Sequence, residues 1–298
     1  MSNEIKQNAV TSVLFMISAS LLIAGTTILA KILGTTTLGP PINPMQISNA
    51  RFFFAFILIS IFFMTTKSKI IKPNYKVHLG RSACGWIGIS ILFGASSIIP
   101  VTDATAIIFT NPIFTMLLSI VLLGEKVKPI KWIAVIITFW GALILIRPEN
   151  NITNHQFIII ILIIGAFVLG LESVFIKMLT LKENPKQILF INNSIGLLIS
   201  SIPIYSIWIT PTTLQILAMV GIGLLMLCAQ ACFIQALRRS KAHFAVPYFY
   251  STLIFVAIYD FFIFNITPDD ISFIGASLII IGGISIYISE IIKKQNTM

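Results

Sequence analysis

Long apolar segments alternate with short polar connections along almost the whole chain. Ten such segments lie at residues 10–33, 47–65, 80–98, 103–123, 132–147, 157–177, 188–209, 214–236, 244–265 and 271–291. A helix needs roughly 20 apolar residues to cross a bilayer, and only a helix satisfies its own backbone hydrogen bonds there at such lengths. We therefore predict an all-α integral membrane protein with ten transmembrane helices. The first segment is too long for the core of a cleaved signal peptide, so we interpret it as the first span.

The composition excludes the main classes of soluble protein. Hydrophobic residues make up 57% of the 298 residues, charged residues make up only 10%, and the mean hydropathy is +0.97. A soluble domain carries about 25% charged residues, so soluble enzymes, disordered chains and disulfide-rich scaffolds do not fit. The three cysteines lie in apolar segments without a neighbouring histidine, so we expect no metal site. The chain has no Gly-x-x-x-x-Gly-Lys loop, so we expect neither ATP hydrolysis nor a cofactor.

The basic residues predict the orientation in the membrane. The net charge is +10, with 20 Lys and Arg against 10 Asp and Glu. Only Lys31, Arg51 and Arg147 lie at one side of the predicted spans, which leaves 17 of the 20 at the other side. Basic residues concentrate on the cytoplasmic side, so we predict cytoplasmic N- and C-termini in a multi-pass protein of the cell inner membrane. The same explanation makes a nucleic-acid partner unnecessary.

The two halves of the chain resemble each other. A shift of 141 residues places Ala134 on Gly275 and Gly141 on Gly282. Each pair of small residues is seven apart, so both members lie on one helix face. Five spans in each half is an odd number, so equivalent spans run in opposite directions, as in many secondary transporters. We predict two inverted five-helix repeats, at residues 1–148 and 149–298.

Two stretches carry a resemblance to a known family. They are residues 100–125, which contain Asn111-Pro112 and end in Gly124-Glu125, and residues 235–283, which contain Pro247-Tyr-Phe-Tyr250. In order and spacing these stretches resemble the EamA branch of the drug/metabolite transporter superfamily. The resemblance implies a ten-helix inverted-repeat bundle, a central cavity and alternating access. It also implies a substrate such as S-adenosylmethionine, riboflavin or an amino acid. The chain departs from the family pattern at Asn265-Ile266, which lacks the acid of Gly124-Glu125.

Glu172 is the clearest candidate for a substrate-binding residue. It lies within the sixth apolar segment, between Leu171 and Ser173. A charge within the membrane costs at least about 2.5–3.5 kcal/mol, so it needs a partner or a role. Glu172 would bind a cationic part of the substrate or carry a proton; alternatively it pairs with Lys177 or is a protonated packing residue.

Three further charges lie near the outer side of the predicted bundle. Asp260 lies within the ninth segment, and we expect it to face the substrate. Arg51 and Asp103 open the second and fourth segments. We interpret them as gating residues, with Arg51 paired to Asp103 or Asp260 when the outer side is shut. The alternatives are a static ion pair and, for Asp103, a helix cap.

The remaining substrate-binding candidates are uncharged. Pro112 follows Asn111 and breaks the fourth helix, because it removes the bond to the carbonyl four residues back; such a break exposes backbone groups to a substrate. Gln230 would bond either the substrate or a neighbouring helix. Tyr250 offers a ring face to an aromatic or cationic group. Glu172 and Asp260 together predict a net negative cavity that favours a cation or zwitterion.

These features indicate a secondary transporter of a small polar metabolite rather than an enzyme. Our first expectation is S-adenosylmethionine uptake, and the alternatives are riboflavin uptake and efflux of amino acids or other metabolites. An intramembrane enzyme is disfavoured because His78, His155 and His243 lie at loops or span ends. A channel or structural membrane subunit fits an inverted repeat with buried acids less well. The expected partners are a small-molecule substrate and the lipid bilayer, and a homodimer remains open.

Overall fold

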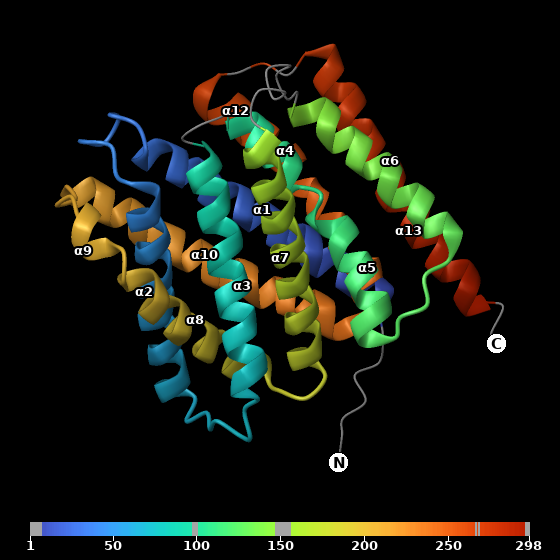
Figure 1. The fold of residues 1–298 in the computed structure, drawn as a ribbon, viewed down its shortest axis with the longest axis horizontal. Coiled ribbons are helices and arrows are strands. Elements are labelled where there is room, and N and C mark those ends of the chain that lie inside the picture. Colours follow the sequence, from blue (N-terminus) through green and yellow to red (C-terminus); the bar gives the residue numbers. More distant parts are fainter. Residues whose placement is uncertain (1–7, 97–100, 147–155, 266, 268, 296–298) are drawn as a thin grey trace.

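The protein is a bundle of helices. The computed structural model describes residues 8–96, 101–146, 156–265, 267 and 269–295, and every regular element in these ranges is helical (Figure 1). In chain order the elements are α1 (Ala9–Leu33), α2 (Pro44–Thr65), α3 (Tyr75–Ser96), α4 (Val101–Ile108), α5 (Asn111–Leu123), α6 (Pro129–Ile146), α7 (Gln156–Thr180), α8 (Pro185–Ser201), α9 (Ile204–Ile207), α10 (Thr213–Arg239), α11 (Ala242–Ala245), the 3₁₀ helix η2 (Val246–Tyr250), α12 (Ser251–Phe264) and α13 (Asp270–Gln295).

The long helices are those of a membrane protein. Within the described residues, seven helical segments are long and apolar enough to cross a bilayer: α1, α2, α6, α7, α10, the run from Ala242 to Phe264, and α13. The other predicted spans are more polar or shorter. Helix α3 carries His78 and Arg81, α5 has 13 residues, and α8 has 17 residues before the short α9. The all-α membrane fold is therefore confirmed, and the number of ten spans stays a prediction.

The predicted fourth and ninth spans are interrupted rather than continuous. Helix α4 ends at Ile108 and α5 begins at Asn111, beside Pro112, which has no N–H to continue the ladder. The ninth span divides into α11, η2 and α12. The 141-residue shift places the start of α4 on the start of α11 and the end of α5 on the end of α12. Both runs therefore begin and end at matching places, and the gap between α4 and α5 falls on the junction of η2 and α12.

The ends of these two runs adopt the same backbone conformation. Gly124 closes α5 with φ of 65° and donates its N–H to the carbonyl of Ser119. Asn265 closes α12 with φ of 55° and donates to the carbonyl of Asp260. Glycine and asparagine are the residues that tolerate this left-handed cap. Asn265 departs from the family pattern in sequence, but it preserves the left-handed cap that ends the helix.

Packing between the helices is symmetric under exchange of the two halves of the chain. Helix α1 packs on α10 and α12, while α7, its counterpart in the second half, packs on α3 and α5. Helix α2 packs on α8 and α10, while α8 packs on α2 and α3. Helices α6 and α13 pack on each other and lie side by side at one edge of the bundle (Figure 1).

Small residues bring α6 and α13 close together. A Cβ atom at Gly141 would lie 2.7 Å from the carbonyl oxygen of Gly275, and one at Gly282 would lie 2.8 Å from that of Ala134. These are the four small residues that the sequence places on matching helix faces. Close backbone approach through small side chains is how membrane helices associate without a hydrophobic driving force between them.

Candidate functional site

A cavity of about 1120 Å³ lies among the helices. Residues of α1 to α8, α10, η2, α12 and α13 line it, so both halves of the chain contribute. Its lining reaches the connections at one end of the bundle, where Gly34, Thr267 and Asp269 lie. The cavity is large enough to hold a small-molecule ligand of drug size.

Three charged side chains of the lining form an electrostatic cluster. Arg51 of α2, Arg81 of α3 and Glu172 of α7 all contribute to the lining, and both arginine charges interact electrostatically with Glu172. Within the described residues, no ion pair within 4.0 Å joins Glu172 to either arginine. Two positive charges therefore face one negative charge in this cluster, while Asp260 and Asp269 add two negative charges elsewhere in the lining.

The position of the Glu172 carboxyl depends on a glycine of α3, which has no side chain to displace it. A Cβ atom at Gly85 would lie 2.9 Å from the Cδ and Oε1 atoms of Glu172. The carboxyl group thus lies against the α3 backbone, where any larger residue would displace it. Lys177, the alternative partner considered for Glu172, instead donates to the carbonyls of Leu237 and Ser240 at 2.6 Å each. It neutralises the negative end of α10.

An amide network lies beside the charged residues. Ser82 donates to Asn192, and the amides of Asn192 and Asn193 donate to the side-chain oxygen of Gln230 at 3.5 and 3.3 Å. Gln230 therefore bonds between helices, and it also lines the cavity. Its oxygen is used by the asparagines, so its NH2 group is the part that can donate to a ligand.

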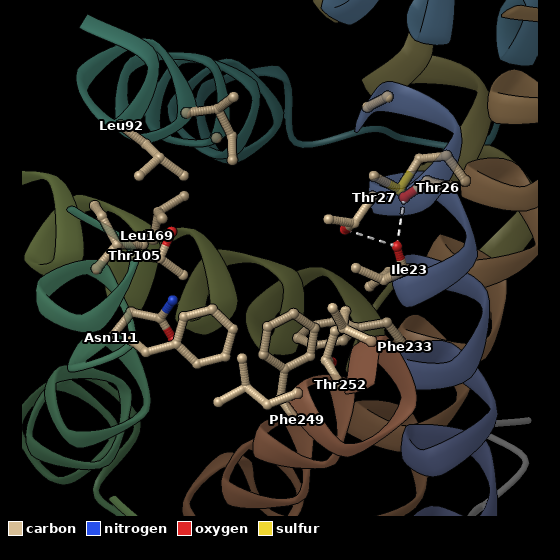
Figure 2. A pocket seen from close by; sticks show the side chains of 18 of the residues that line it. Ile23, Thr26, Thr27, Leu92, Thr105, Asn111, Leu169, Phe233, Phe249 and Thr252 are labelled. Atoms are coloured by element: carbon tan, nitrogen blue, oxygen red, sulfur yellow. Dashed lines mark hydrogen bonds between the residues drawn. The ribbon is translucent and has the colours of Figure 1, made fainter. Parts of the chain in front are cut away.

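Phenylalanines, rather than the predicted tyrosine, form the aromatic part of the lining. Phe249 stacks on Phe109 with ring centroids 6.1 Å apart and meets Phe233 edge-on at the same distance. Figure 2 shows Phe233, Phe249 and Asn111 extending from different helices toward one space. Asn111 lies at the break between α4 and α5, as the sequence indicated. The lining thus offers apolar ring faces next to polar groups.

Tyr250 lies behind this lining and not in it. Its side chain is fully buried among Ala142, Ile279 and neighbouring rings. Its hydroxyl donates to the carbonyl of Phe109 at 2.7 Å. Phe109 and Tyr250 are 141 residues apart. This bond therefore joins equivalent points of the predicted fourth and ninth spans. The structure therefore gives Tyr250 a place in the packing of the two breaks and brings no part of it to the cavity surface.

The expected pairing at the outer end is different in the structure. Asp260 lines the cavity and accepts a hydrogen bond from Lys31 at 2.8 Å, across α1 and α12. Arg51 does not contact Asp260; its guanidinium lies 4.3 Å from the ring centre of Phe52. The Arg51–Asp260 pair is therefore not formed. The side chain of Asp103 lies outside the described part of the structure.

The opposite end of the bundle is held by buried histidine–glutamate pairs. Glu125 accepts from the backbone N–H groups of Ala242 and His243 at 2.9 and 3.2 Å and contacts His243 Nδ1 at 2.6 Å. Lys131 lies 3.1 Å from His243 Nε2. A lysine ammonium only donates, so Nε2 accepts and Nδ1 carries the proton that Glu125 accepts. Burial favours the protonated form of Glu125, but the hydrogen bonds from His243 and Ala242 outweigh it, and the pKa of Glu125 falls below its ordinary 4.5.

A second pair joins the halves with the roles exchanged: the glutamate comes from the second half and the histidine from the first. Glu183, between α7 and α8, accepts from the backbone N–H of Asn74 and contacts His78 Nε2, both at 2.8 Å. The amide of Gln187 donates to the same carboxylate at 2.6 Å. In each pair a carboxylate from one half meets the start of a helix from the other, where negative charge is stabilised. We call the Glu125–His243 and Glu183–His78 pairs the two clamps.

Sequence reasoning missed Arg81 and both clamps. Arg81 was counted among the basic residues of the cytoplasmic connection, yet it lies inside α3 with 1% of its surface exposed. A local signal existed: the side chain of Asn74 accepts from the N–H of Val77 and marks a helix start before Tyr75. That start places Arg81 almost two turns inside the helix.

Comparison with known proteins agrees with a transporter. The S-adenosylmethionine uptake transporter of Rickettsia prowazekii is 26% identical over 254 residues, which cover 85% of this chain and 86% of that protein. The riboflavin transporter of Rhizobium johnstonii is 24% identical over 249 residues, covering 81% and 80%. A solved crystal structure has the same fold, with a TM-score of 0.81 at 14% identity over 92% of this chain and 95% of that one.

A family model identifies the chain directly. The model of the EamA-like transporter family matches residues 10–147 and again residues 156–288. The two matches together include all of the lining residues. The chain therefore belongs to the EamA-like transporter family.

Proposed function

We propose that the protein is a secondary transporter that takes up S-adenosylmethionine by alternating access. The observation that carries the proposal is the cavity, which combines phenylalanine rings with Arg51, Arg81 and Glu172 inside a membrane bundle. S-adenosylmethionine has a purine ring for the aromatic part and an amino-acid group and sulfonium for the charged part. The similarity to the rickettsial S-adenosylmethionine uptake transporter supports the same substrate.

The proposed substrate contacts are the candidate residues that line the cavity. They are Glu172, Asn111, Gln230 and Asp260. Riboflavin is the second candidate, because the stacked rings of Phe109 and Phe249 also suit a flavin. Riboflavin is neutral, however, and would leave the two arginines with Glu172 as their shared counter-charge, which is costly for buried charges.

The proposed architecture is ten spans in two inverted halves, residues 1–148 and 149–298. The exchange-symmetric packing of α1, α2, α7 and α8 supports it, as do the matching breaks 141 residues apart. The proposed location is the inner membrane with both termini in the cytoplasm. On that orientation the two clamps lie on the cytoplasmic side and the cavity reaches the outer side. Reporter fusions at residue 298 and within residues 148–156 test it: periplasmic activity of the C-terminal fusion contradicts it.

Transport by the purified protein tests the proposed function. Proteoliposomes that contain unlabelled S-adenosylmethionine should accumulate the labelled compound from outside by exchange, and empty liposomes should not. Unlabelled riboflavin outside should leave that exchange unchanged. Accumulation of riboflavin with no exchange of S-adenosylmethionine would overturn the proposed substrate and keep the transporter.

A further inference from the structure

The charged end of the cavity has the composition of a site for a zwitterion. Its three charged groups come from three helices, Arg51 from α2, Arg81 from α3 and Glu172 from α7. They interact electrostatically, and no direct ion pair closes the space between Glu172 and either arginine in the described residues. Charges that only compensated one another would be expected in direct contact, because buried ions need close, hydrogen-bonded partners.

Both arginines have unused hydrogen-bonding capacity. The Nε atoms of Arg51 and Arg81 are buried and have no hydrogen-bond partner among the described residues. Arg81 donates from Nη1 to the carbonyl of Ile188 at 3.4 Å, which is a long bond. A guanidinium carries five N–H donors in a planar fork that matches the two oxygens of a carboxylate. Arg81 lines the cavity and is acted on by the charge of Glu172, so a carboxylate at this edge of the cavity would give it a second counter-charge.

The opposite charge lies against the backbone of the helix that carries Arg81. The Glu172 carboxyl lies against Gly85, one turn along α3 from Arg81. The NH2 group of Gln230 adds a neutral donor at the same end. A carboxylate on the arginines and an ammonium on Glu172 would satisfy all three charges, and the phenylalanine rings would hold an apolar or aromatic remainder.

We infer that Arg51, Arg81 and Glu172 form a recognition site for the α-amino-acid group of the transported molecule. The arginines bind its carboxylate and Glu172 binds its ammonium group. This inference rests on the proposed function for the identity of the rest of the ligand. The transporter then selects compounds that carry a free amino-acid group and discriminates against the same compounds without the carboxylate.

Binding of ligand analogues to the unmodified protein tests the inference without any risk to folding. The protein in lipid nanodiscs is titrated with S-adenosylmethionine, with decarboxylated S-adenosylmethionine, with 5′-methylthioadenosine, with free methionine and with riboflavin. A hydrogen-bonded carboxylate on arginine should make S-adenosylmethionine bind about 10- to 100-fold more tightly than its decarboxylated form. 5′-Methylthioadenosine, which lacks the amino-acid group, should bind more weakly than S-adenosylmethionine.

Two sets of variants assign the contacts to residues. In Arg51→Gln and Arg81→Gln the preference for S-adenosylmethionine over its decarboxylated form should fall toward one, while affinity for the decarboxylated form stays similar. Gly85→Ala should displace the Glu172 carboxyl and weaken S-adenosylmethionine binding about tenfold. Its matched control on the same helix is Gly94→Ala, where a Cβ atom meets nothing within 4 Å, and binding should be unchanged.

The outcomes separate the inference from the proposed function. Equal binding of S-adenosylmethionine and its decarboxylated form overturns the amino-acid site and leaves the substrate standing. Carboxylate-dependent binding of methionine without binding of S-adenosylmethionine supports the site and overturns the substrate. Binding of riboflavin alone, or of none of the compounds, overturns both.

Discussion

The Glu125 clamp should decide how often the end of the bundle that carries it opens, which is the cytoplasmic end in the proposed orientation. In Glu125→Gln the side chain keeps its size, but the amide NH2 group now faces donors of His243. The variant loses the charge and at least one of the three hydrogen bonds that reach Glu125. Losing a hydrogen bond to a buried charged group costs up to about 3 kcal/mol. That free energy corresponds to roughly a hundredfold shift in the equilibrium between closed and open forms of this end.

Cysteine labelling measures that shift directly. A single cysteine replaces Phe233, which lines the cavity, after the three native cysteines are changed to alanine. In the proposed orientation, a membrane-impermeant maleimide added to inside-out vesicles labels it only when the end with the clamps opens. Glu125→Gln should raise the labelling rate by up to roughly a hundredfold. Asp270→Asn removes an exposed acid at the start of α13 and is the matched control, with an unchanged rate.

The pH dependence of labelling gives a second test with a definite sign. The pKa of Glu125 is lowered in the closed form, so the clamp stabilises that form above pH 4.5 and loses strength as the pH falls below it. The difference between wild type and Glu125→Gln should therefore be largest near neutral pH and shrink below pH 4.5. A folded Glu125→Gln protein with wild-type labelling at neutral pH would refute the assignment of a closing role.

Three further changes test the packing. Tyr250→Phe should lower the free energy of unfolding by about 1–3 kcal/mol, because a carbonyl at the other helix break loses its donor; SDS titration in mixed micelles measures it. Gly282→Ala should cost about 1–3 kcal/mol by forcing α6 from α13, whereas Gly94→Ala should be neutral or stabilising in the same assay. A double-mutant cycle on Lys31 and Asp260 should give a coupling in uptake of at most about 1 kcal/mol, since both side chains are partly exposed.

The sequence predicts the helices well where the ends carry their own signals. Asn43 and Asn184 cap α2 and α8, each followed by a proline at the first helical position, and Thr212 forms a capping box with Gln215. The break before α5 follows from Pro112. The junction between η2 and α12 has no proline at the position equivalent to Pro112. It can be predicted only by transferring the break in the first half to the second half through the repeat.

The site was less predictable because its parts depend on contacts between distant segments. Glu172 and Gln230 were found from the cost of polar groups inside a membrane. Arg81 was missed because the orientation rule counts basic residues near span ends. It does not distinguish an exposed basic side chain from a buried one. The partners of His78 and His243 are more than 100 residues away in sequence, so no local pattern indicates that these side chains are buried.

The two ends of the bundle are stabilised unequally, and this asymmetry bears on the transport cycle. The clamps join the halves at one end through two buried pairs, with at most 7% of any partner side chain exposed. At the other end the Lys31–Asp260 pair is partly exposed, and surface pairs contribute little. The repeat supplies no matching acid there, because the shift of 141 residues places Glu125 on Ile266. Without substrate the equilibrium should therefore favour the form whose clamps are closed, with the cavity reaching the Lys31 side.

A substrate can reverse this preference only through its difference in affinity for the two forms. The closed clamps set an equilibrium constant that favours one form. To make the two forms equally populated, the substrate must bind the other form more tightly by the same factor. That factor is roughly a hundredfold if one clamp contributes about 3 kcal/mol. The charged cluster of Arg51, Arg81 and Glu172 is suited to that task. Its residues come from α2, α3 and α7, which belong to both halves, so a zwitterion bound among them, as we propose, would draw the halves together around itself. Closure around an amino-acid group would then supply the free energy that opens the clamps.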